Sequence, residues 1–575
     1  MSNPFSAPRL AATAAVLSLA IGSLLPAQAQ TEAGVPTEVV LHFFGGSAAD
    51  GVNPVAGVVQ AADGNFYGTT LSGGAPGNGG TVFRLTADGV LTTLHAFDAR
   101  SGSSDGSTPR GALVIGADGR LYGTTEEGGA FGLGTVFAVS TGGNYQLVHS
   151  FNGVTGAAPR AGLTRVGGLL FGVASSGGIG NAGTAFRVDG GGFVNRIHAF
   201  DAAQGATPQA ALSLGSDGNL YGTTQGGGLG DGSVFRLSTA GALNVLHRFA
   251  PNAQTGYAGP GSNGVVERAG VVFGSTPGDA GAVAAPGTAG SVFRIESTGG
   301  LSTLYRFAGV DGAQPGSLVR SSDGRLYGST RSGGSDGVGV IFRIAEAGED
   351  FRLLHQFTAG SRSADGARPN PLIEDADGRL VGTAFASTLP PRFGRADVRN
   401  GAGAVFALYP RAPRISIELI PAIAAAGQPV TIRWTADAGA EGCTASGDWR
   451  GARAASGEAT VSSARVGERP FRLECANPAG SVTETATLSI APAPAVTLTA
   501  SPAFTNNRTP STTLSWTAVG AATCTASGEW NGPRPISSSV VVTPGIRGRN
   551  SYTLSCTGIG GTTSDSVNVF RFGEP

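Results

Sequence analysis

Short runs of alternating apolar and polar residues recur along the first 408 residues, and clusters of Gly, Asp and Ser separate them. The stretch from Leu212 to Phe249, LSLGSDGNLYGTTQGGGLGDGSVFRLSTAGALNVLHRF, contains four such runs. Alternation of this kind predicts short β-strands with one face buried. The Asp217-Gly218 pair lies between two nearly contiguous runs, where a tight hairpin requires positive φ. The pattern therefore predicts a four-stranded, all-β unit.

Three landmarks each occur seven times, so the unit is a repeat. An aromatic residue followed by Gly occurs at Tyr67, Tyr122, Phe171, Tyr221, Phe273 and Tyr327, with a degenerate copy at Val381. An apolar residue precedes Phe at Phe83, Phe137, Phe186, Phe235, Phe293, Phe342 and Phe406. A ring lies two residues before Phe at His42, His95, His149, His198, His247, Tyr305 and His355. A period of about 50 residues with four strands predicts propeller blades.

The order of the landmarks predicts how the ring of blades closes. The array begins with the His-x-Phe strand and ends with the strand that contains Phe406, so the seventh blade lacks its fourth strand. The N-terminal run Glu38–Phe44 is the strand left over, and pairing the two leaves no free sheet edge. We expect residues 30–409 to form a seven-bladed β-propeller that the N-terminal strand closes.

Two copies of a smaller unit follow, with boundaries at Pro410–Pro413 and Ala491–Pro494. CTASGDW at Cys443 matches CTASGEW at Cys524, and alternating short strands predict an immunoglobulin-like β-sandwich for residues 410–491 and another for 492–575. In both copies a Trp, at 434 or 516, precedes the first Cys, an order that allows the disulfide to join neighbouring strands of one sheet.

The four cysteines all follow the repeats, and two pairs have the same spacing. Even numbers of cysteines at matched spacing in an exported chain predict disulfides, here Cys443 with Cys475 and Cys524 with Cys556. The competing interpretation is a zinc site, but no histidine follows His355.

Residues 1–29 have the composition of a secretory signal peptide: Arg9, the apolar run Leu10–Leu25, and Ala27-Gln28-Ala29 as a cleavage site. The alternative is an uncleaved anchor, for which the apolar run is short. We expect a secreted or periplasmic protein with no membrane span after signal cleavage. Charged residues are 13% of the chain and the net charge is −1, which argues against a nucleic-acid partner. Lysine is absent from the chain, which excludes Schiff-base chemistry and a P-loop.

The signature DGNLYGTT…GG…G[TS]VFRL…LHxF, as at Asp217–Phe249, resembles the choice-of-anchor GloVer-repeat proteins over roughly residues 37–408. The resemblance implies export and varied C-terminal anchors, and it implies no catalytic residue, because no activity is established for the family as a class. The C-terminal residues Arg571–Pro575 are not an apolar sorting tail, so free secretion or periplasmic residence fits better than surface anchoring.

The search for chemistry yields structural interpretations rather than a reaction. All six histidines occupy one repeat position on the fourth strand, which a closed ring would hold far apart at its rim, so we expect each to contact a neighbouring blade. Asp-Gly-x-x-Pro recurs at Asp50, Asp105, Asp311 and Asp365, and either Ca²⁺ binding or local turns would use those carboxylates. We favour turns, and we predict no metal, no cofactor and no catalytic residue.

The architecture favours an exported, monomeric, non-catalytic binding protein that recognises an extracellular glycan or protein, with the sandwiches as spacers. The alternative is a secreted propeller enzyme, a polysaccharide lyase or hydrolase, whose catalytic groups would converge from different blades. Carboxylates, His or Tyr converging in the central channel would favour the enzyme.

The candidate site lies on the face where the loops after the second and fourth strands emerge, because these loops are long and the opposite turns are tight. The repeat breaks most at Phe385–Gly403 and less at Pro277–Gly290. If this face recognises a ligand, the first of these loops, beside Asp50, suits an acidic sugar or a carboxylate; the interpretation we favour is an insertion with no partner. The candidate binding residues are Asp50, Arg392, Phe393, Arg395, Asp397 and Arg399.

Overall fold

The computed structural model describes residues 36–47, 49–75, 77–100, 104–250, 259–261, 263–278, 289–358, 366–386, 402–436, 440 and 442–573. These residues form an all-β protein, and their one helical element is a 3₁₀ turn, η1 (Ile179–Asn181). The predicted signal peptide lies outside the described residues.

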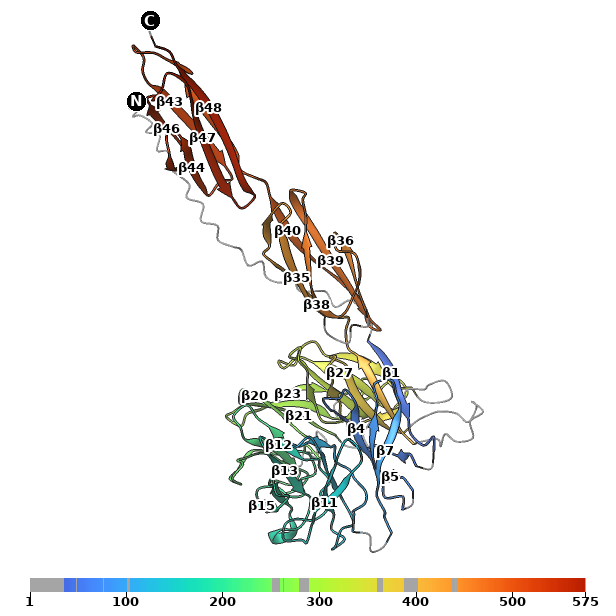
Figure 1. The fold of residues 1–575 in the computed structure, drawn as a ribbon. Helices are drawn as coiled ribbons and strands as arrows, with labels where there is room; N and C mark the ends of the chain where they lie inside the picture. The colour runs from blue at the N-terminus through green and yellow to red at the C-terminus, as the bar shows by residue number, and fades with distance from the viewer. Residues whose placement is uncertain are drawn as a thin grey trace, which may run out of the picture.

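Seven antiparallel sheets of four or five strands follow one another in the repeat region (Figure 1). Sheet 1 contains β3 (Val59–Gln60), β4 (Phe66–Thr70), β6 (Thr81–Leu85) and β7 (Leu91–Ala96). Sheet 2 contains β8 (Val114–Ile115), β9 (Leu121–Thr125), β10 (Thr135–Val139) and β11 (Tyr145–Ser150). Sheet 3 contains β12 (Thr164–Val166), β13 (Leu169–Ala174), β14 (Thr184–Val188) and β15 (Val194–Ala199). Sheet 4 contains β16 (Ser213–Leu214), β17 (Leu220–Thr224), β18 (Ser233–Leu237) and β19 (Leu243–Arg248).

The remaining three sheets keep this strand order. Sheet 5 contains β20 (Val266–Arg268), β21 (Val271–Thr276), β22 (Ser291–Ile295) and β23 (Leu301–Arg306). Sheet 6 contains β24 (Ala313–Pro315), β25 (Val319–Arg320), β26 (Leu326–Ser332), β27 (Val340–Ile344) and β28 (Arg352–Gln356). Sheet 7 contains β29 (Ala367–Pro369), β30 (Ile373–Glu374), β31 (Leu380–Ala386), β32 (Ala404–Tyr409) and β1 (Thr37–Phe43). A two-stranded ladder joins β2 (Gly51–Val52) to β5 (Ser72–Gly73).

The N-terminal strand β1 is the outer strand of the last sheet. It pairs antiparallel with β32, with Val40 opposite Phe406 and His42 opposite Val405, and a bulge lies between these pairs. The same bulge recurs where the fourth strand pairs in the other sheets, for example between Val136 and Phe137. The predicted pairing of the N-terminal strand is therefore confirmed.

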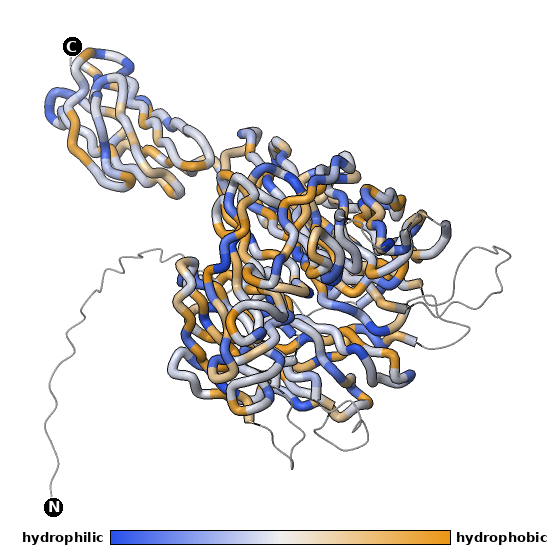
Figure 2. The backbone as a smooth tube through the Cα atoms, turned by 90° about the horizontal axis from the view of Figure 1, so that it is seen from below, coloured by the Kyte–Doolittle hydropathy of each residue, from blue (hydrophilic) through white to orange (hydrophobic). Residues whose placement is uncertain are grey.

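Each sheet packs on the next one, and sheet 7 packs on sheet 1. The clearest contact is a pair of Phe rings, one at the end of a fourth strand and one on the third strand of the next sheet, with centroids 5.1–5.6 Å apart. The seven pairs are Phe44–Phe83, Phe97–Phe137, Phe151–Phe186, Phe200–Phe235, Phe249–Phe293, Phe307–Phe342 and Phe357–Phe406. The apolar core is consequently divided among the contacts between sheets, and hydrophobic residues run through every sheet (Figure 2).

A polar contact repeats beside these rings. A hydroxyl on the second strand donates to a carbonyl of the next sheet, as Thr124 Oγ1 does to Ala161 O at 2.8 Å. The bond from sheet 7 to sheet 1 is equivalent: Thr383 Oγ1 donates to Ala56 O, also at 2.8 Å. Because buried polar groups require partners, these bonds fix the distance between neighbouring sheets.

The Asp-Gly turns explain why the aromatic landmark recurs. Asp63 Oδ2 accepts a hydrogen bond from the Tyr67 hydroxyl at 2.7 Å, and Asp63 Oδ1 accepts one from the backbone N–H of Asn65. Gly64 takes φ +80° between them. Burial and the bond to Asp63 raise the pKa of Tyr67 to about 12, so the phenol stays protonated and donates to the turn.

Each C-terminal unit has a three-stranded and a five-stranded sheet on either side of an apolar core. In the first unit the smaller sheet contains β33 (Ile415–Ile420), β35 (Pro429–Ala436) and β38 (Ser456–Ser462). The larger one contains β34 (Ile423–Ala425), β40 (Gly480–Ala491), β39 (Gly467–Asn477), β36 (Gly442–Gly447) and β37 (Gly451–Arg453). In the second unit the smaller sheet contains β41 (Ala495–Ser501), β43 (Thr512–Val519) and β46 (Ser537–Val542). The larger one contains β42 (Phe504–Thr505), β48 (Gly561–Arg571), β47 (Gly548–Gly558), β44 (Thr523–Gly528) and β45 (Gly532–Arg534).

Both predicted disulfides are confirmed, and each joins neighbouring strands of one sheet. Cys443 lies opposite Cys475 in the β36–β39 ladder, and Cys524 lies opposite Cys556 in the β44–β47 ladder. The Cα–Cα distance is 4.1 Å in both pairs. Disulfides persist in oxidising compartments, so these two bonds indicate an extracellular or periplasmic protein.

Candidate functional site

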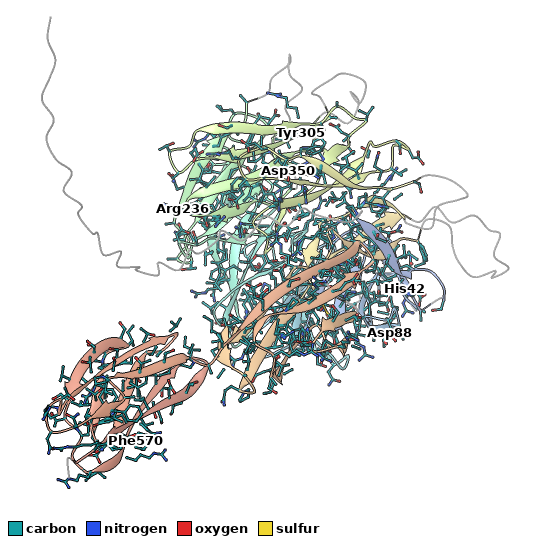
Figure 3. All side chains as sticks on the ribbon, turned by 90° about the horizontal axis from the view of Figure 1, so that it is seen from above. His42, Asp88, Arg236, Tyr305, Asp350 and Phe570 are labelled. Atoms are coloured by element: carbon teal, nitrogen blue, oxygen red, sulfur yellow. A yellow bond between two sulfur atoms is a disulfide. The ribbon has the colours of Figure 1, made fainter. Side chains whose placement is uncertain are left out.

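The six histidines do not form a common site. They lie on different sheets, and Figure 3 shows His42 well separated from Tyr305, which takes the equivalent position in sheet 5. Two of the rings illustrate the contacts made instead: His95 Nε2 lies 3.1 Å from Asp105 in its own following loop, and His198 Nδ1 lies 3.2 Å from the Gly241 carbonyl in sheet 4. Among the described residues no three His, Cys, Asp or Glu side chains are grouped as metal ligands would be.

These histidines make the stability of the repeat region pH-dependent. Burial lowers the pKa of His42, His95, His149 and His247 below 6.5. Below pH 6.5 the unfolded chain therefore binds protons that the folded chain does not, and stability falls as the pH falls through this range. We expect the melting temperature to decrease from pH 7 to pH 5, and to decrease less when these four residues are Tyr, as in sheet 5. Melting curves over this range that have the same slope in both proteins would contradict the assignment.

Asp50 lies in a turn just ahead of β2. Its carboxylate accepts hydrogen bonds from the backbone N–H and the hydroxyl of Ser47, at 3.1 and 2.8 Å, and its charge acts on His42 of the outer strand β1. Asp105 and Asp311 likewise face the ring of the fourth strand, at His95 and Tyr305. The remaining candidate binding residues, Arg392, Phe393, Arg395, Asp397 and Arg399, lie outside the described residues.

A recurring Pro sets the geometry of the face from which the predicted loop leaves. The residue before this Pro takes φ between +50° and +62° in six sheets, and its N–H donates to a carbonyl of the preceding sheet. Arg368 N, for example, donates to Val338 O at 2.8 Å. The Pro ring packs against a Gly of the preceding sheet: a Cβ on Gly134 would lie 2.7 Å from Pro159 Cδ. The same contact joins Gly403 of sheet 7 to Pro54, ahead of sheet 1.

Three positions in each sheet therefore recur in space on this face: the residues before and after the Pro, and the residue that follows the second strand's Thr-Thr or its equivalent. We call them the loop-face positions. They are Asn53, Val55, Leu71, Thr108, Arg110, Glu126, Ala158, Arg160, Ser175, Thr207, Gln209, Gln225, Gly259, Gly261, Pro277, Gln314, Gly316, Arg331, Arg368, Asn370 and Phe385. Their backbone repeats while their side chains differ, and they include four arginines and one glutamate. A chain of net charge −1 thus concentrates positive charge here.

Glu126 holds two of these arginines together across two sheets. Its side chain is 10% exposed, its Oε1 accepts from Arg160 Nε at 2.7 Å, and its Oε2 accepts from Arg110 Nε. Arg110 and Arg160 remain 40% exposed, so this buried carboxylate orients two guanidinium groups that still reach solvent. Glu126 is the sole carboxylate among the loop-face positions defined above, and both of its oxygens are engaged by arginine.

The other two arginines have no acidic partner within the described part of the chain. Arg331 lies on β26 of sheet 6, and Arg368 lies on β29 of sheet 7; both side chains are exposed. Burial of part of the guanidinium, together with the charges of Arg368 and Arg110, lowers the pKa of Arg331. These cations are therefore close enough to repel one another, and an anionic ligand would relieve that repulsion.

Sequence reasoning missed this cluster, which lies on the face that it selected from the long loops. It compared the lengths of equivalent loops. The arginines occupy positions at which the length is constant and only the residue type changes from sheet to sheet. Comparing the residues on either side of the recurring Pro would have revealed Arg110, Arg160 and Arg368. The effect of the Arg110 charge on Arg331 depends on the packing of sheets that are distant in sequence.

The repeated sheets define a tandem-repeat all-β protein. The chain belongs to the family described as the Gloeobacter/Verrucomicrobia repeat, whose model matches residues 28–186, 103–285 and 214–425, more than half of the chain. The predicted family is thereby confirmed. No curated protein matches the chain.

Several solved structures resemble it weakly. A protein of unknown function from Dyadobacter fermentans is 12% identical, with 66% of this chain and 98% of that chain covered and a TM-score of 0.37. One from Bacteroides thetaiotaomicron is 11% identical, with the same coverage and a TM-score of 0.33. A candidate 6-phosphogluconolactonase from Bacteroides fragilis is 18% identical over 55% of this chain and 88% of that chain, with a TM-score of 0.36. These values are too low to carry an argument about activity. In the described residues no helix is long and apolar enough to span a membrane.

Proposed function

We propose that this chain is an exported, non-catalytic binding protein whose loop face recognises a carboxylate-bearing ligand on a glycan or a protein. In this proposal residues 1–29 are a signal peptide, residues 30–409 form a closed seven-bladed propeller, and residues 410–491 and 492–575 are immunoglobulin-like spacers. The seven Phe pairs, which include Phe44–Phe83 between the last and first sheets, support the closure. The predicted loop with Arg392, Phe393, Arg395, Asp397 and Arg399 would extend the same face.

The observation that carries the proposal is the arginine cluster at the loop-face positions. Arg268 and Arg320, on the opposite face of the repeat region, are both paired with Glu346. Arg331 and Arg368 are exposed and lack such partners in the described chain, and the charges of Arg368 and Arg110 both act on Arg331. Arginine suits carboxylates because its planar fork forms two parallel hydrogen bonds.

Neutralising Arg331 and Arg368 should abolish most binding. We expect the secreted protein to bind polygalacturonate or alginate on a panel of acidic and neutral glycans and acidic peptides, and to bind less tightly as salt increases. Arg331→Gln with Arg368→Gln should weaken this binding at least tenfold, measured by calorimetry. Arg268→Gln with Arg320→Gln is the matched control on the opposite face and should leave the affinity unchanged. Equal affinities for the two double variants would remove the loop face from the proposal.

A further inference from the structure

The second C-terminal unit carries an unusual outward face on its five-stranded sheet. Along β47 the side chains alternate, and Tyr552, Leu554 and Cys556 point into the core. The residues between them, together with their partners on β44 and β48, form the outer face. Those outward positions are Thr523, Thr525 and Ser527 on β44, Ser551, Thr553, Ser555 and Thr557 on β47, and Thr562, Ser564, Ser566 and Asn568 on β48. We call this surface the hydroxyl face.

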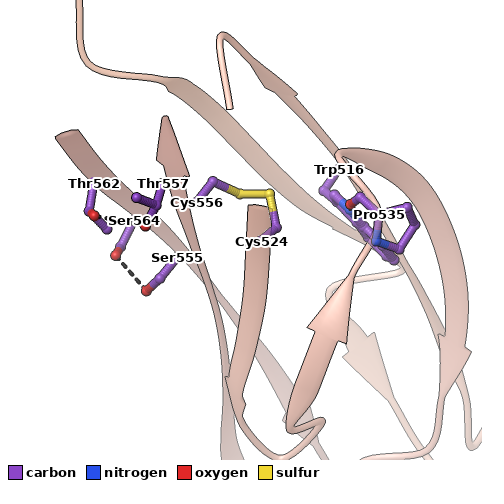
Figure 4. Close-up of a disulfide and its surroundings, with 8 residues drawn as sticks. All are labelled: Trp516, Cys524, Pro535, Ser555, Cys556, Thr557, Thr562 and Ser564. Carbon is purple, nitrogen blue, oxygen red and sulfur yellow. Dashed lines mark hydrogen bonds between the residues drawn. A yellow bond between two sulfur atoms is a disulfide. The ribbon is translucent and has the colours of Figure 1, made fainter. Parts of the chain in front are cut away.

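Hydroxyl groups on neighbouring strands of the hydroxyl face are hydrogen-bonded to one another. Three cross-strand pairs, Thr553–Ser566, Ser555–Ser564 and Thr557–Thr562, have oxygen–oxygen distances of 2.7, 2.7 and 2.8 Å. Figure 4 shows Ser555 bonded to Ser564, with the Cys524–Cys556 disulfide and Trp516 on the other side of these strands. A hydroxyl has one donor and two acceptor sites, so each bonded pair retains one donor and several acceptors for a ligand.

Three phenyl rings continue the hydroxyl face at one end. Phe504 of the edge strand β42 lies opposite Phe570 of β48, and Phe572 follows two residues later on the same side. The ring of Phe504 is 6.0 Å from Phe570 and 5.8 Å from Phe572, with interplanar angles of 28° and 24°. Phe504 is 59% exposed, Phe570 39% and Phe572 57%. Figure 3 labels Phe570 on this unit. Three adjacent exposed phenyls form an apolar platform that the core of the unit does not use.

The first C-terminal unit shows that the fold does not require these residues. When the two units are aligned on their disulfides, the residues equivalent to Phe504, Phe570 and Phe572 of the second unit are Ile423, Ser489 and Ala491 of the first. Likewise, Arg472 and Glu474 stand where the second unit has Thr553 and Ser555. The second unit has therefore exchanged charges for hydroxyls and small or aliphatic residues for phenyls on this face.

We propose that the hydroxyl face and its phenyl platform bind an extended neutral polysaccharide, of the β-linked glucan class. The electron-rich faces of the phenyl rings suit the C–H groups on the flat side of a sugar ring. The hydroxyl rows provide donors and acceptors for the sugar hydroxyls. Arg549 lies opposite Phe570 at the end of these rows, and its Nε donates to Asn568 Oδ1 at 2.9 Å. A second copy of this chain is a less suitable ligand for this face. Most of the face is polar, and three phenyl rings bury far less area than a stable dimer needs. The proposal is independent of the arginine site.

The full chain tests the proposal through its binding to microcrystalline cellulose and to a soluble mixed-linkage β-glucan. We expect saturable binding to at least one of them, unaffected by salt. Phe504→Ile with Phe570→Ser and Phe572→Ala gives the second unit the residues of the first, so it should fold, and it should weaken binding at least tenfold. Thr553→Arg with Ser555→Glu likewise imports residues from the first unit and should weaken binding without touching the phenyls.

The melting curve and disulfide map of each variant check folding. Size-exclusion chromatography with light scattering checks the competing occupant, because a wild-type dimer that the triple Phe variant converts to a monomer would make the platform a self-association surface and overturn the proposal. Absence of binding to both glucans, or equal binding by wild type and both folded variants, would overturn it as well. Arg331→Gln with Arg368→Gln should bind both glucans normally, which separates this site from the loop face.

Discussion

Deleting Thr37–Phe43 should destabilise the whole repeat region, because β1 is the outer strand of the last sheet although it lies first in the chain. The deletion exposes the hydrogen-bonding edge of β32 and removes apolar side chains of β1, among them Val40 and Phe43, that pack against the buried core of sheet 7. Losing two or three such contacts costs about 3 kcal/mol or more. The strand β32 would also become an edge strand with free backbone groups, and such an edge promotes aggregation. We expect the melting temperature of the repeat region to fall by about 4 °C or more.

Rescue in trans distinguishes the loss of this strand from general damage to the terminus. A synthetic peptide TEVVLHF should raise the melting temperature of the deleted protein as its concentration rises, because it binds the folded state alone. A scrambled peptide of the same composition should have no effect. A deleted protein that melts like the full chain would mean that β1 contributes nothing to the stability of sheet 7.

Local, periodic signals explain why most of the fold could be predicted from the sequence. The aromatic-Gly, Val-Phe and His-x-Phe landmarks each report a residue that packs in the same way in every sheet, as the seven Phe pairs show. The pairing of β1 followed from counting the strands in each repeat. The disulfides followed from the matched Cys spacing in two copies of one unit.

The two proposed binding surfaces were harder to predict, because both depend on residues that depart from the repeat. Arg110 and Arg160 converge on Glu126 only because sheets 2 and 3 pack at a fixed register, and Arg331 and Arg368 come from the far end of the repeat region. Phe504 and Phe570 meet through the parallel pairing of β42 with β48, which no alternation pattern reveals. In both cases the useful signal is a difference in residue type between structurally equivalent positions.

Gly134→Ala should cause a large loss of stability, and Gly132→Ala two residues earlier should not. Gly134 has φ +94°, and a Cβ there would lie 2.4 Å from Thr125 O and 2.7 Å from Pro159 Cδ of the next sheet. Both atoms belong to rigid groups, so the sheets would have to move apart. Backbone strain of about 1–2 kcal/mol adds to overpacking of about 1–3 kcal/mol, which gives an expected loss of about 2–5 kcal/mol.

Gly132 isolates the contact between sheets from the backbone conformation. It also has positive φ, +71°, but a Cβ there would meet nothing within 4 Å. Gly132→Ala should therefore cost only the conformational strain, about 1–2 kcal/mol. Urea unfolding of the two variants measures the difference, and equal losses would show that the Gly134–Pro159 contact does not hold sheets 2 and 3 together. Since the same Gly–Pro contact recurs at Gly403 and Pro54, Gly403→Ala should reproduce the larger loss where the last sheet meets the first.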